Sequence, residues 1–289
     1  MMLEKPTNVK ILEVLHRRMR FEEDDEKSYW RIIKGFEGEC EFYEWLKKYS
    51  FPMLILYDLF LTCGISTQLD FVIITANKIF LLDVKNFKGD YHYRNGEFYT
   101  SWNEKVTSNP ITQLNRGYNV LEGSLKKTGM RPLIEKKLIF INPEFTLYGN
   151  QPDLPIVLRS QLNEYLKSIE SQADPLQNYP HQVAANLEKI KLAQNPYEKT
   201  PKYSYEMLDK GILCKSCGEN HLREGHRSLL CSSCGLSETK SSAIERMIEE
   251  YHLLFPDRKF TPTILKEWCG NVVSLDLCGR VLRKYLRSN

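Results

Sequence analysis

Short runs of large apolar residues, many of them β-branched, recur through the middle of the chain and are bounded by turn-forming residues. Such runs predict β-strands, because branched and aromatic side chains favour the extended backbone. In residues 70–76 and 78–87 the apolar side chains occupy both alternating positions, so we expect helices to cover both faces of the sheet. The predicted strands are residues 51–61, 70–76, 78–87, 136–142 and 155–159.

Other segments repeat their apolar residues at helical spacing. Residues 111–127 are the clearest case. Ser108 or Asn109 can cap this helix, and Pro110 suits its first position. The order of helices and strands predicts an α/β domain of about 170 residues. The predicted helices are residues 11–23, 35–50, 111–127, 181–193, 243–255, 261–269 and 274–286.

These patterns divide the chain into five parts. The division places an α/β domain in the first half and smaller elements after it. The predicted parts are an N-terminal helix (1–30), the α/β domain (31–170), a helical linker (171–205), a cysteine-rich segment (206–240) and a three-helix tail (241–289).

The composition is that of an ordinary globular chain, with 289 residues of which 42% are hydrophobic and 27% charged. The formal net charge of +3 is too small to indicate nucleic-acid binding by itself. No apolar segment approaches the roughly 18 residues that cross a membrane, and the N-terminus lacks the apolar core of a signal peptide. We therefore expect a cytoplasmic protein without a membrane partner, and the sequence predicts no oligomeric state.

Three charged residues, Asp70, Asp83 and Lys85, stand at the ends of two apolar strands. If a two-residue turn at 77–78 joins these strands, Asp70 lies opposite Lys85. Side chains alternate between the faces of a strand, so Asp83 and Lys85 share a face with their cross-strand partners. The charges then converge within about 5–8 Å at one end of the hairpin. They form either an ion pair that closes the sheet or, with a divalent cation offsetting the buried carboxylates, a metal site.

Four short motifs extend this pattern: GFEGE at 35–39, TQLDFVIIT at 67–75, LLDVKNFKG at 81–89 and NPITQ at 109–113. In this order they resemble successive motifs of the NERD, or nuclease-related, domain. The acidic residue on one strand followed by D-V-K on the next resembles the core of the PD-(D/E)XK nucleases. The resemblance covers roughly residues 30–145. It implies a restriction-endonuclease-like mixed sheet flanked by helices.

The resemblance also implies a phosphodiesterase site that requires Mg²⁺ or Mn²⁺. Asp70 and Asp83 would bind this metal, with the backbone carbonyl of Val84 as a further ligand. Family members often carry Glu where this chain has Asp83. The shorter side chain keeps the charge but can move the metal.

Three further residues receive roles from the same resemblance. Lys85 would position or activate the attacking water. Glu39, expected in the first turn of helix 35–50 on its buried side, would complete the acidic set. Gln113 would touch a metal-bound water or a DNA phosphate. The implied function is hydrolysis of DNA phosphodiester bonds, and the alternative is a catalytically weak or inactive module that binds nucleic acid or recruits a partner.

Four of the eight cysteines lie in two similar motifs, CKSCG at 214–218 and CSSCG at 231–235. Each motif lets one tight turn present two thiolates to a single metal, and its Gly relieves the backbone. The spacing predicts a structural Zn²⁺ site, with C-x-x-C redox chemistry as the alternative, and fits a reducing compartment. The segment resembles the zinc ribbons of topoisomerase-type tails, which implies either DNA contact or a stabilising role. The predicted ligands are Cys214, Cys217, Cys231 and Cys234.

The last two predicted helices, residues 261–269 and 274–286, are joined by a short turn, and the final one is basic. This arrangement is typical of a helix-turn-helix motif, with Arg280, Arg283 and Lys284 on the helix that contacts DNA. The alternative is a three-helix bundle that packs on the α/β domain.

Overall fold

The computed structural model describes residues 3–192, 200–220 and 222–288, which fall into two compact units. Unit 1 comprises Met1–Pro6 and Trp30–Glu198, and unit 2 comprises Thr7–Tyr29 and Lys199–Asn289. The second unit therefore combines residues from both ends of the chain. Within the described ranges, no helix is both long and apolar enough to cross a membrane.

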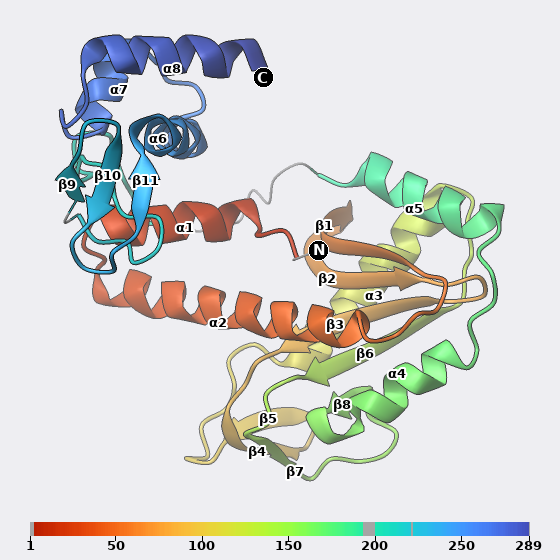
Figure 1. Cartoon of the computed structure of the whole chain (residues 1–289). Helices are drawn as coiled ribbons and strands as arrows, with labels where there is room; N and C mark the ends of the chain where they lie inside the picture. Colours follow the sequence, from red (N-terminus) through yellow and green to blue (C-terminus); the bar gives the residue numbers. More distant parts are fainter. Residues whose placement is uncertain (1–2, 193–199, 221, 289) are drawn as a thin grey trace. The chain divides into compact units, whose positions relative to one another are not determined.

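Unit 1 is built on a mixed five-stranded sheet with the strand order β1-β2-β3-β6-β8 (Figure 1). β1, β2 and β3 are antiparallel neighbours, whereas β6 runs parallel to β3 and β8 parallel to β6. The predicted mixed sheet flanked by helices is confirmed. Its strands are β1 (Leu54–Cys63), β2 (Ile65–Ile74), β3 (Ile79–Lys85), β6 (Ile134–Phe140) and β8 (Ile156–Leu158).

Helices cover both faces of this sheet, as the two-sided apolar pattern predicted (Figure 1). Phe71 and Leu82 pack in one buried cluster with residues of α2 and α4. Val72 and Leu81 pack in a second cluster with residues of α3 and α5. A 3₁₀ turn, η1 (Arg159–Gln161), leads into α4. The helices are α2 (Glu23–Leu46), α3 (Pro110–Lys127), α4 (Leu162–Glu170) and α5 (Asn178–Ile190).

The start of α3 agrees with the predicted capping. The Asn109 side chain accepts hydrogen bonds from the N–H groups of Ile111 and Thr112, and Pro110 is the first helical residue. α3 also lies close to the sheet, since a Cβ at Gly117 would be 3.0 Å from the Leu69 side chain. These two features fix where the first turns of α3 stand relative to β2.

A second, three-stranded sheet in the order β5-β4-β7 was not predicted from the sequence. Its strands are short, and only Phe98 and Leu147 are buried, in the cluster that also contains α3. Asn95 and Gly96 form the turn between β4 and β5 with positive φ angles of 51° and 80°. Asn-Gly is a strong hairpin signal, so the sequence did contain this information. The strands are β4 (Gly89–Arg94), β5 (Glu97–Thr100) and β7 (Phe145–Tyr148).

The loop between β2 and β3 differs from the predicted two-residue turn. Ile74 pairs with Ile79, so residues 75–78 form a four-residue loop. The register is thereby shifted by two residues, and Asp70 is not opposite Lys85. The prediction of this pairing was wrong, but a two-residue shift keeps each side chain on its predicted face. The charged residues are therefore still brought to the same end of the hairpin.

Unit 2 combines α1 with a small sheet in the order β11-β10-β9 and three helices, and it also contains the first residues of α2. The three predicted helices of the tail are confirmed. The Thr261 hydroxyl caps α7, and Gly270 and Asn271 end it with positive φ angles of 69° and 61°. The elements are α1 (Thr7–Arg18), β9 (Leu222–Glu224), β10 (Ser228–Cys231), β11 (Ser237–Thr239), α6 (Lys240–Leu254), α7 (Pro262–Trp268) and α8 (Leu275–Ser288).

Arg18, at the end of α1, is only 1% exposed and connects the parts of unit 2. Its guanidinium pairs with the Glu250 carboxylate of α6 and donates to the backbone carbonyls of Asp209 and Gly211 at 2.7 and 3.0 Å. It also lies over the Trp268 ring, 4.2 Å from the ring centroid. A buried guanidinium needs a partner for its charge and acceptors for its N–H groups. Here α6, the segment 209–211 and α7 supply these contacts.

We expect Arg18→Ala to lower the free energy of unfolding of unit 2 by about 3 kcal/mol, because it leaves the Glu250 carboxylate without its partner. Hydrogen–deuterium exchange should speed up in peptides from α6, whereas peptides from β2 and β3 of unit 1 keep their protection. The exposed neighbour Arg17 provides a matched control as Arg17→Ala. Wild-type protection of α6 in the Arg18→Ala variant would contradict the expectation.

Candidate active site and cysteine cluster

Asp83 and Lys85 occupy the end of β3, beyond its last pair with β2. Asp83 Oδ1 and Lys85 Nζ form an ion pair, and the two side chains are 10% and 15% exposed. Leu82 and Val84, which alternate with them, point into the cluster that contains α2 and α4. Asp83 and Lys85 therefore share the opposite face, as strand alternation predicts.

Asp70 interrupts the regular geometry of β2. Leu69 and Phe71 belong to opposite core clusters, so the alternation of faces is broken between them. The Asp70 carboxylate is directed toward β3, where Oδ2 accepts a hydrogen bond of 2.8 Å from the backbone N–H of Val84. This bond fixes Asp70 at the end of β3 that carries Asp83.

Glu39 reaches the same region from α2. The helix begins at Glu23, so Glu39 lies in its middle and not, as predicted, in the first turn. Glu39 does face the sheet, because its Oε2 accepts a hydrogen bond from the Tyr57 hydroxyl of β1. The preceding Gly38 permits this approach, since a Cβ there would lie 2.7 Å from the Cβ of Asn86, just after β3. A larger residue at this position would push α2 away from the site.

Asp58 is a further acidic residue here, which the sequence analysis did not select. It stands opposite Asp70, where the ladder between β1 and β2 skips one pair, and has a φ angle of 53°. This left-handed backbone is uncommon outside glycine, although Asp tolerates it. The Asp58 carboxylate accepts a hydrogen bond from the Gln68 side chain. The signal that could have identified Asp58 in the sequence is a single charged residue inside an otherwise apolar strand.

Burial and mutual repulsion shift the pKa values of these groups. Burial, followed by the charge of Asp83, raises the pKa of Asp70 well above its ordinary value. Burial also raises the pKa of Glu39, although the Tyr57 hydroxyl favours the ionised form. For Lys85, burial favours the neutral amine, but Asp83 and Asp70 outweigh this effect and raise its pKa. The site therefore holds one protonated amine, that of Lys85, and more carboxylates than this single positive charge can neutralise.

This excess of carboxylates fits a divalent cation such as Mg²⁺, which prefers oxygen ligands and is often held by one or two carboxylates. Asp83 Oδ1 is buried and, among the described residues, has only Lys85 as a partner. The Val84 carbonyl faces the β2 side, because the Lys85 carbonyl accepts the Ile141 N–H on the β6 side and successive carbonyls alternate. In the described part of the chain no three carboxylates bring oxygens within 4.8 Å of one another. The protein would thus supply part of the ligand shell.

Gln113, in the first turns of α3, lines a groove of about 460 Å³. The lining of this groove does not include Asp70 or Asp83, and the predicted contact of Gln113 with a metal-bound water or a DNA phosphate stays a prediction. The groove does include Gln68, whose side chain donates to Asp58. It is lined by hydroxyl, amide and charged side chains: Thr67, Gln68, Glu97, Lys105, Thr107, Ser108, Asn109, Thr112, Gln113 and Arg116.

The predicted DNA-binding residues of the tail lie in unit 2, on the exposed side of α8. Arg280, Arg283 and Lys284 are exposed, and Arg287 extends the basic surface. Lys284 forms a long ion pair with Glu245 at 3.5 Å. These four basic side chains form an exposed, positively charged surface on α8.

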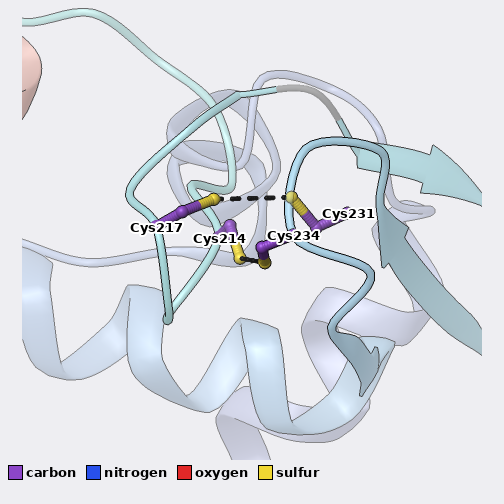
Figure 2. A group of neighbouring side chains, drawn as sticks. All are labelled: Cys214, Cys217, Cys231 and Cys234. Carbon is purple, nitrogen blue, oxygen red and sulfur yellow. Dashed lines mark hydrogen bonds between the residues drawn. The ribbon is translucent and has the colours of Figure 1, made fainter.

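The four predicted zinc ligands gather between two neighbouring turns of unit 2 (Figure 2). All four sulfur atoms lie within 4.8 Å of one another, and two pairs are 3.6 and 3.5 Å apart. Sulfurs around Zn²⁺ with bonds of about 2.3 Å form a tetrahedron with edges of about 3.8 Å, whereas a disulfide bond measures about 2.05 Å. The cluster of free thiols therefore has the size of a zinc site. The measured pairs are Cys214 with Cys234 and Cys217 with Cys231.

The two cysteine motifs fold into the same turn. The Gly218 N–H donates to the Cys214 carbonyl at 2.9 Å, and the Gly235 N–H donates to the Cys231 carbonyl at 3.0 Å. Both glycines have a φ angle of 75°. Backbone N–H groups, that of Cys234 above all, lower the pKa of Cys231 to about 6. The pKa of Cys214 is also lowered, despite its burial. At neutral pH the Cys231 sulfur thus favours the thiolate, the form that binds zinc, whereas the pKa of Cys217 is raised to about 12 by hydrogen bonds with the neighbouring sulfurs.

We expect one zinc ion per chain, because a closed set of four thiolates is a structural zinc site. Replacing Cys214 and Cys231 together by Ser should abolish zinc binding, measured by elemental analysis of the purified protein. Cys40→Ser, which lies outside the cluster, is the matched control and should retain the metal. Full zinc content in the double variant would refute this site.

The raised pKa of Asp70 predicts a pH-dependent stability. Ionising Asp70 in the folded state is unfavourable, so its contribution to stability falls as pH rises from about 4 through the folded pKa. At neutral pH without Mg²⁺ or Mn²⁺, Asp70→Asn should therefore raise the unfolding temperature of unit 1 by roughly 2–4 °C, with no gain at about pH 4 or below. Mg²⁺ should stabilise the wild type more than the variant.

The control for this measurement is Asp153→Asn, at an exposed carboxylate of the same unit. Identical melting of wild type and Asp70→Asn at every pH would show that Asp70 carries no ionisation cost.

Residues 34–141 match the family model of the nuclease-related domain. The matched segment runs from α2 past the end of β6 and includes Glu39, Asp70, Asp83 and Lys85. Searches of the curated proteins and of the solved structures gave no match. The resemblance found in the sequence motifs is thus confirmed by the family model. The segment of this chain that carries the acidic residues at the end of β3 is a nuclease-related domain.

Proposed function

We propose that the nuclease-related domain hydrolyses DNA phosphodiester bonds with the help of Mg²⁺ or Mn²⁺. The observation that carries the proposal is the gathering of Asp70, Asp83 and Lys85 at one end of β3. This site contains more carboxylates than cations, which a divalent metal would compensate. The proposal also rests on the family match, which concerns a nuclease-related domain.

The metal would be held by the carboxylates of Asp70 and Asp83 and by the carbonyl of Val84. When bound, it supplies Lewis-acid activation of a phosphoryl oxygen. The hydrogen bond from the Val84 N–H keeps the Asp70 carboxylate in a fixed orientation. The ligand geometry thereby depends on β3 itself and needs no mobile loop.

Lys85 would act as a cation, because neighbouring carboxylates raise its pKa and keep it protonated. Its ammonium can donate hydrogen bonds to an attacking water or to a phosphate oxygen, and a permanently charged amine is a poor general base. Glu39 is better suited to accept a proton, since its pKa is raised from the ordinary value. Gln113 would then contact the nucleic acid from the groove beside α3.

The zinc cluster and the tail would contribute to DNA binding. A closed Cys₄ zinc site is structural, so its contribution is to hold the ribbon in shape. The exposed Arg280 and Arg283 of α8 can neutralise phosphates. The packing of α7 and α8 is compatible with a helix-turn-helix motif and with a plain helical bundle.

A second candidate function is binding of nucleic acid without cleavage. It is favoured by the ion pair between Asp83 and Lys85, which already neutralises one carboxylate. Among the described residues, no three carboxylates bring their oxygens within 4.8 Å of one another, which supports it as well. In this case the acidic residues would have only a structural role, and the tail would recruit DNA or a partner.

A cleavage assay separates the two candidates. Full-length protein is incubated with plasmid DNA and with single-stranded DNA, in Mg²⁺, in Mn²⁺ and in chelator. We expect metal-dependent cleavage that falls at least about 100-fold in Asp83→Asn and in Lys85→Met, since each removes a group from the reacting centre. Asp153→Asn should cleave at the wild-type rate.

Two outcomes would contradict the proposal. Cleavage that survives unchanged in Lys85→Met comes from another site or from a contaminant. DNA binding without cleavage in any metal, lost in the Arg280→Ala/Arg283→Ala variant, would establish the second candidate instead.

A further inference from the structure

The outer face of the small sheet in unit 1 carries a row of aromatic side chains. His92 of β4 lies directly opposite Tyr148 of β7 on one side and Tyr99 of β5 on the other. Tyr99 in turn forms an isolated bridge with Lys105. Directly opposed residues share a face, so these four side chains form one continuous row across the sheet. We call Tyr148, His92, Tyr99 and Lys105 the aromatic row.

The aromatic row is not needed to fill the core. Phe98 and Leu147, on the other face of the same sheet, supply the buried contacts. His92 is exposed, and Tyr148 is 51% exposed. Their rings stack with centroids 5.0 Å apart and an interplanar angle of 21°. β7 is an edge strand, and within the described residues Tyr148 has no other ring partner, so its outer ring face is open.

Cations and a further aromatic residue accompany the aromatic row. The Arg94 guanidinium lies over the Tyr99 ring, 4.4 Å from its centroid. Trp102, in the loop that follows β5, is 86% exposed. Arg94 also bonds to Asn103 in that loop, which places the loop beside the sheet. Exposed aromatic rings stack on nucleobases, and interleaved arginines add cation–π contacts.

The aromatic row leads into the polar groove beside α3. Lys105 ends the row and lines the groove, where Glu97 is its ion-pair partner at 3.0 Å. Arg116 adds a second cation on the α3 side. The one acidic side chain of this groove, Glu97, also accepts a hydrogen bond from Asn109 and is already neutralised. Arg94, Lys105 and Arg116 against Glu97 and Asp90 leave one net positive charge on the groove and the row, and the exposed Glu104 lies next to Lys105 in the loop.

The groove in turn reaches Asp58, beside the acidic residues of the proposed active site. Gln68 lines the groove and donates to the Asp58 carboxylate. Asp58 stands opposite Asp70 in the sheet. A chain that follows the aromatic row and the groove would thus arrive at the end of β3, where a phosphodiester bond would be cut.

We propose that the aromatic row and the groove bind a single-stranded nucleic acid and guide it to the acidic residues. The bases would stack on Tyr148, His92 and Trp102, and the phosphates would be neutralised by Arg94, Lys105 and Arg116. A single strand is the occupant because its unpaired bases expose their ring faces, whereas those of a duplex are covered by stacking. This inference extends the proposed nuclease function, since it names the form of nucleic acid that the same site receives.

The test is binding of fluorescent oligonucleotides to full-length protein in buffer without Mg²⁺ or Mn²⁺, where the proposed cleavage does not occur and the expected zinc site stays intact. The probes are an oligothymidylate and an oligouridylate of about 12 nucleotides and a DNA duplex of the same length. We expect the His92→Ala/Tyr148→Ala variant to bind the single strands about 10-fold more weakly and the duplex unchanged. Comparison of the two single strands separates DNA from RNA.

Three variants control the measurement. Tyr148→Phe keeps the ring and should bind like the wild type. Tyr179→Ala removes an exposed aromatic residue of α5 in the same unit and should also have no effect. Asp83→Asn should lose cleavage but keep single-strand binding, so the two proposals fail independently. Unaltered thermal unfolding of each variant excludes a loss of fold as the cause.

Photo-crosslinking gives a second readout. An oligonucleotide with bromodeoxyuridine should crosslink to peptides that contain residues 89–105 or 145–148. Unchanged single-strand affinity in His92→Ala/Tyr148→Ala, or crosslinks confined to α8, would overturn the inference even if the protein cleaves DNA. Aromatic-dependent binding without any cleavage would instead support the inference and reject hydrolysis.

Discussion

The geometry of the candidate active site depends on one hydrogen bond, from the backbone N–H of Val84 to the carboxylate of Asp70. Regular pairing of β2 and β3 has ended at this point, so the bond takes the place of a ladder contact. It fixes a buried carboxylate beside Asp83, although bringing two such groups together out of water is costly. The interrupted ladder at Asp58 and the close approach of α2 at Gly38 both accommodate this arrangement. Local irregularities of the fold thus bring acidic residues from α2, β1, β2 and β3 to one place.

The two units are stabilised in different ways. Unit 1 has a sheet with apolar clusters on both faces. These clusters hold the strands in place where the pairing of β1, β2 and β3 is interrupted. Unit 2 also buries large apolar side chains, among them Tyr251 and Trp268, and adds the polar contacts of the buried Arg18. Zinc held by its cysteine cluster would add a metal-dependent constraint, since zinc binding by thiolates contributes directly to folding. On this proposal, removing zinc would destabilise unit 2 and leave the core of unit 1 intact.

The proposed activity and the proposed single-strand surface use different physical effects. Charge is concentrated at the end of β3, where burial makes each carboxylate strongly dependent on its neighbours. The aromatic row lies in solvent, where stacking tolerates every base and carries little sequence information. Such a division would let the domain hold a strand without reading its sequence. It would give a role to Tyr148 and His92, which are exposed on the outer face of the small sheet while Phe98 and Leu147 join the core on the other.

Much of the fold followed from the sequence because hydrophobic periodicity reports which faces are buried. Alternation alone put Asp83 and Lys85 on one face, and an error of two residues in the hairpin register did not alter this, since side chains repeat every second residue. The cysteine spacing likewise predicted the cluster of Cys214, Cys217, Cys231 and Cys234, because each turn is local. Only the tertiary structure revealed Asp58, the small sheet and the groove beside α3, because these arise where the ladder is interrupted and where distant segments pack. Local patterns determined which residues are buried and which turns form, whereas long-range packing decided which polar residues meet.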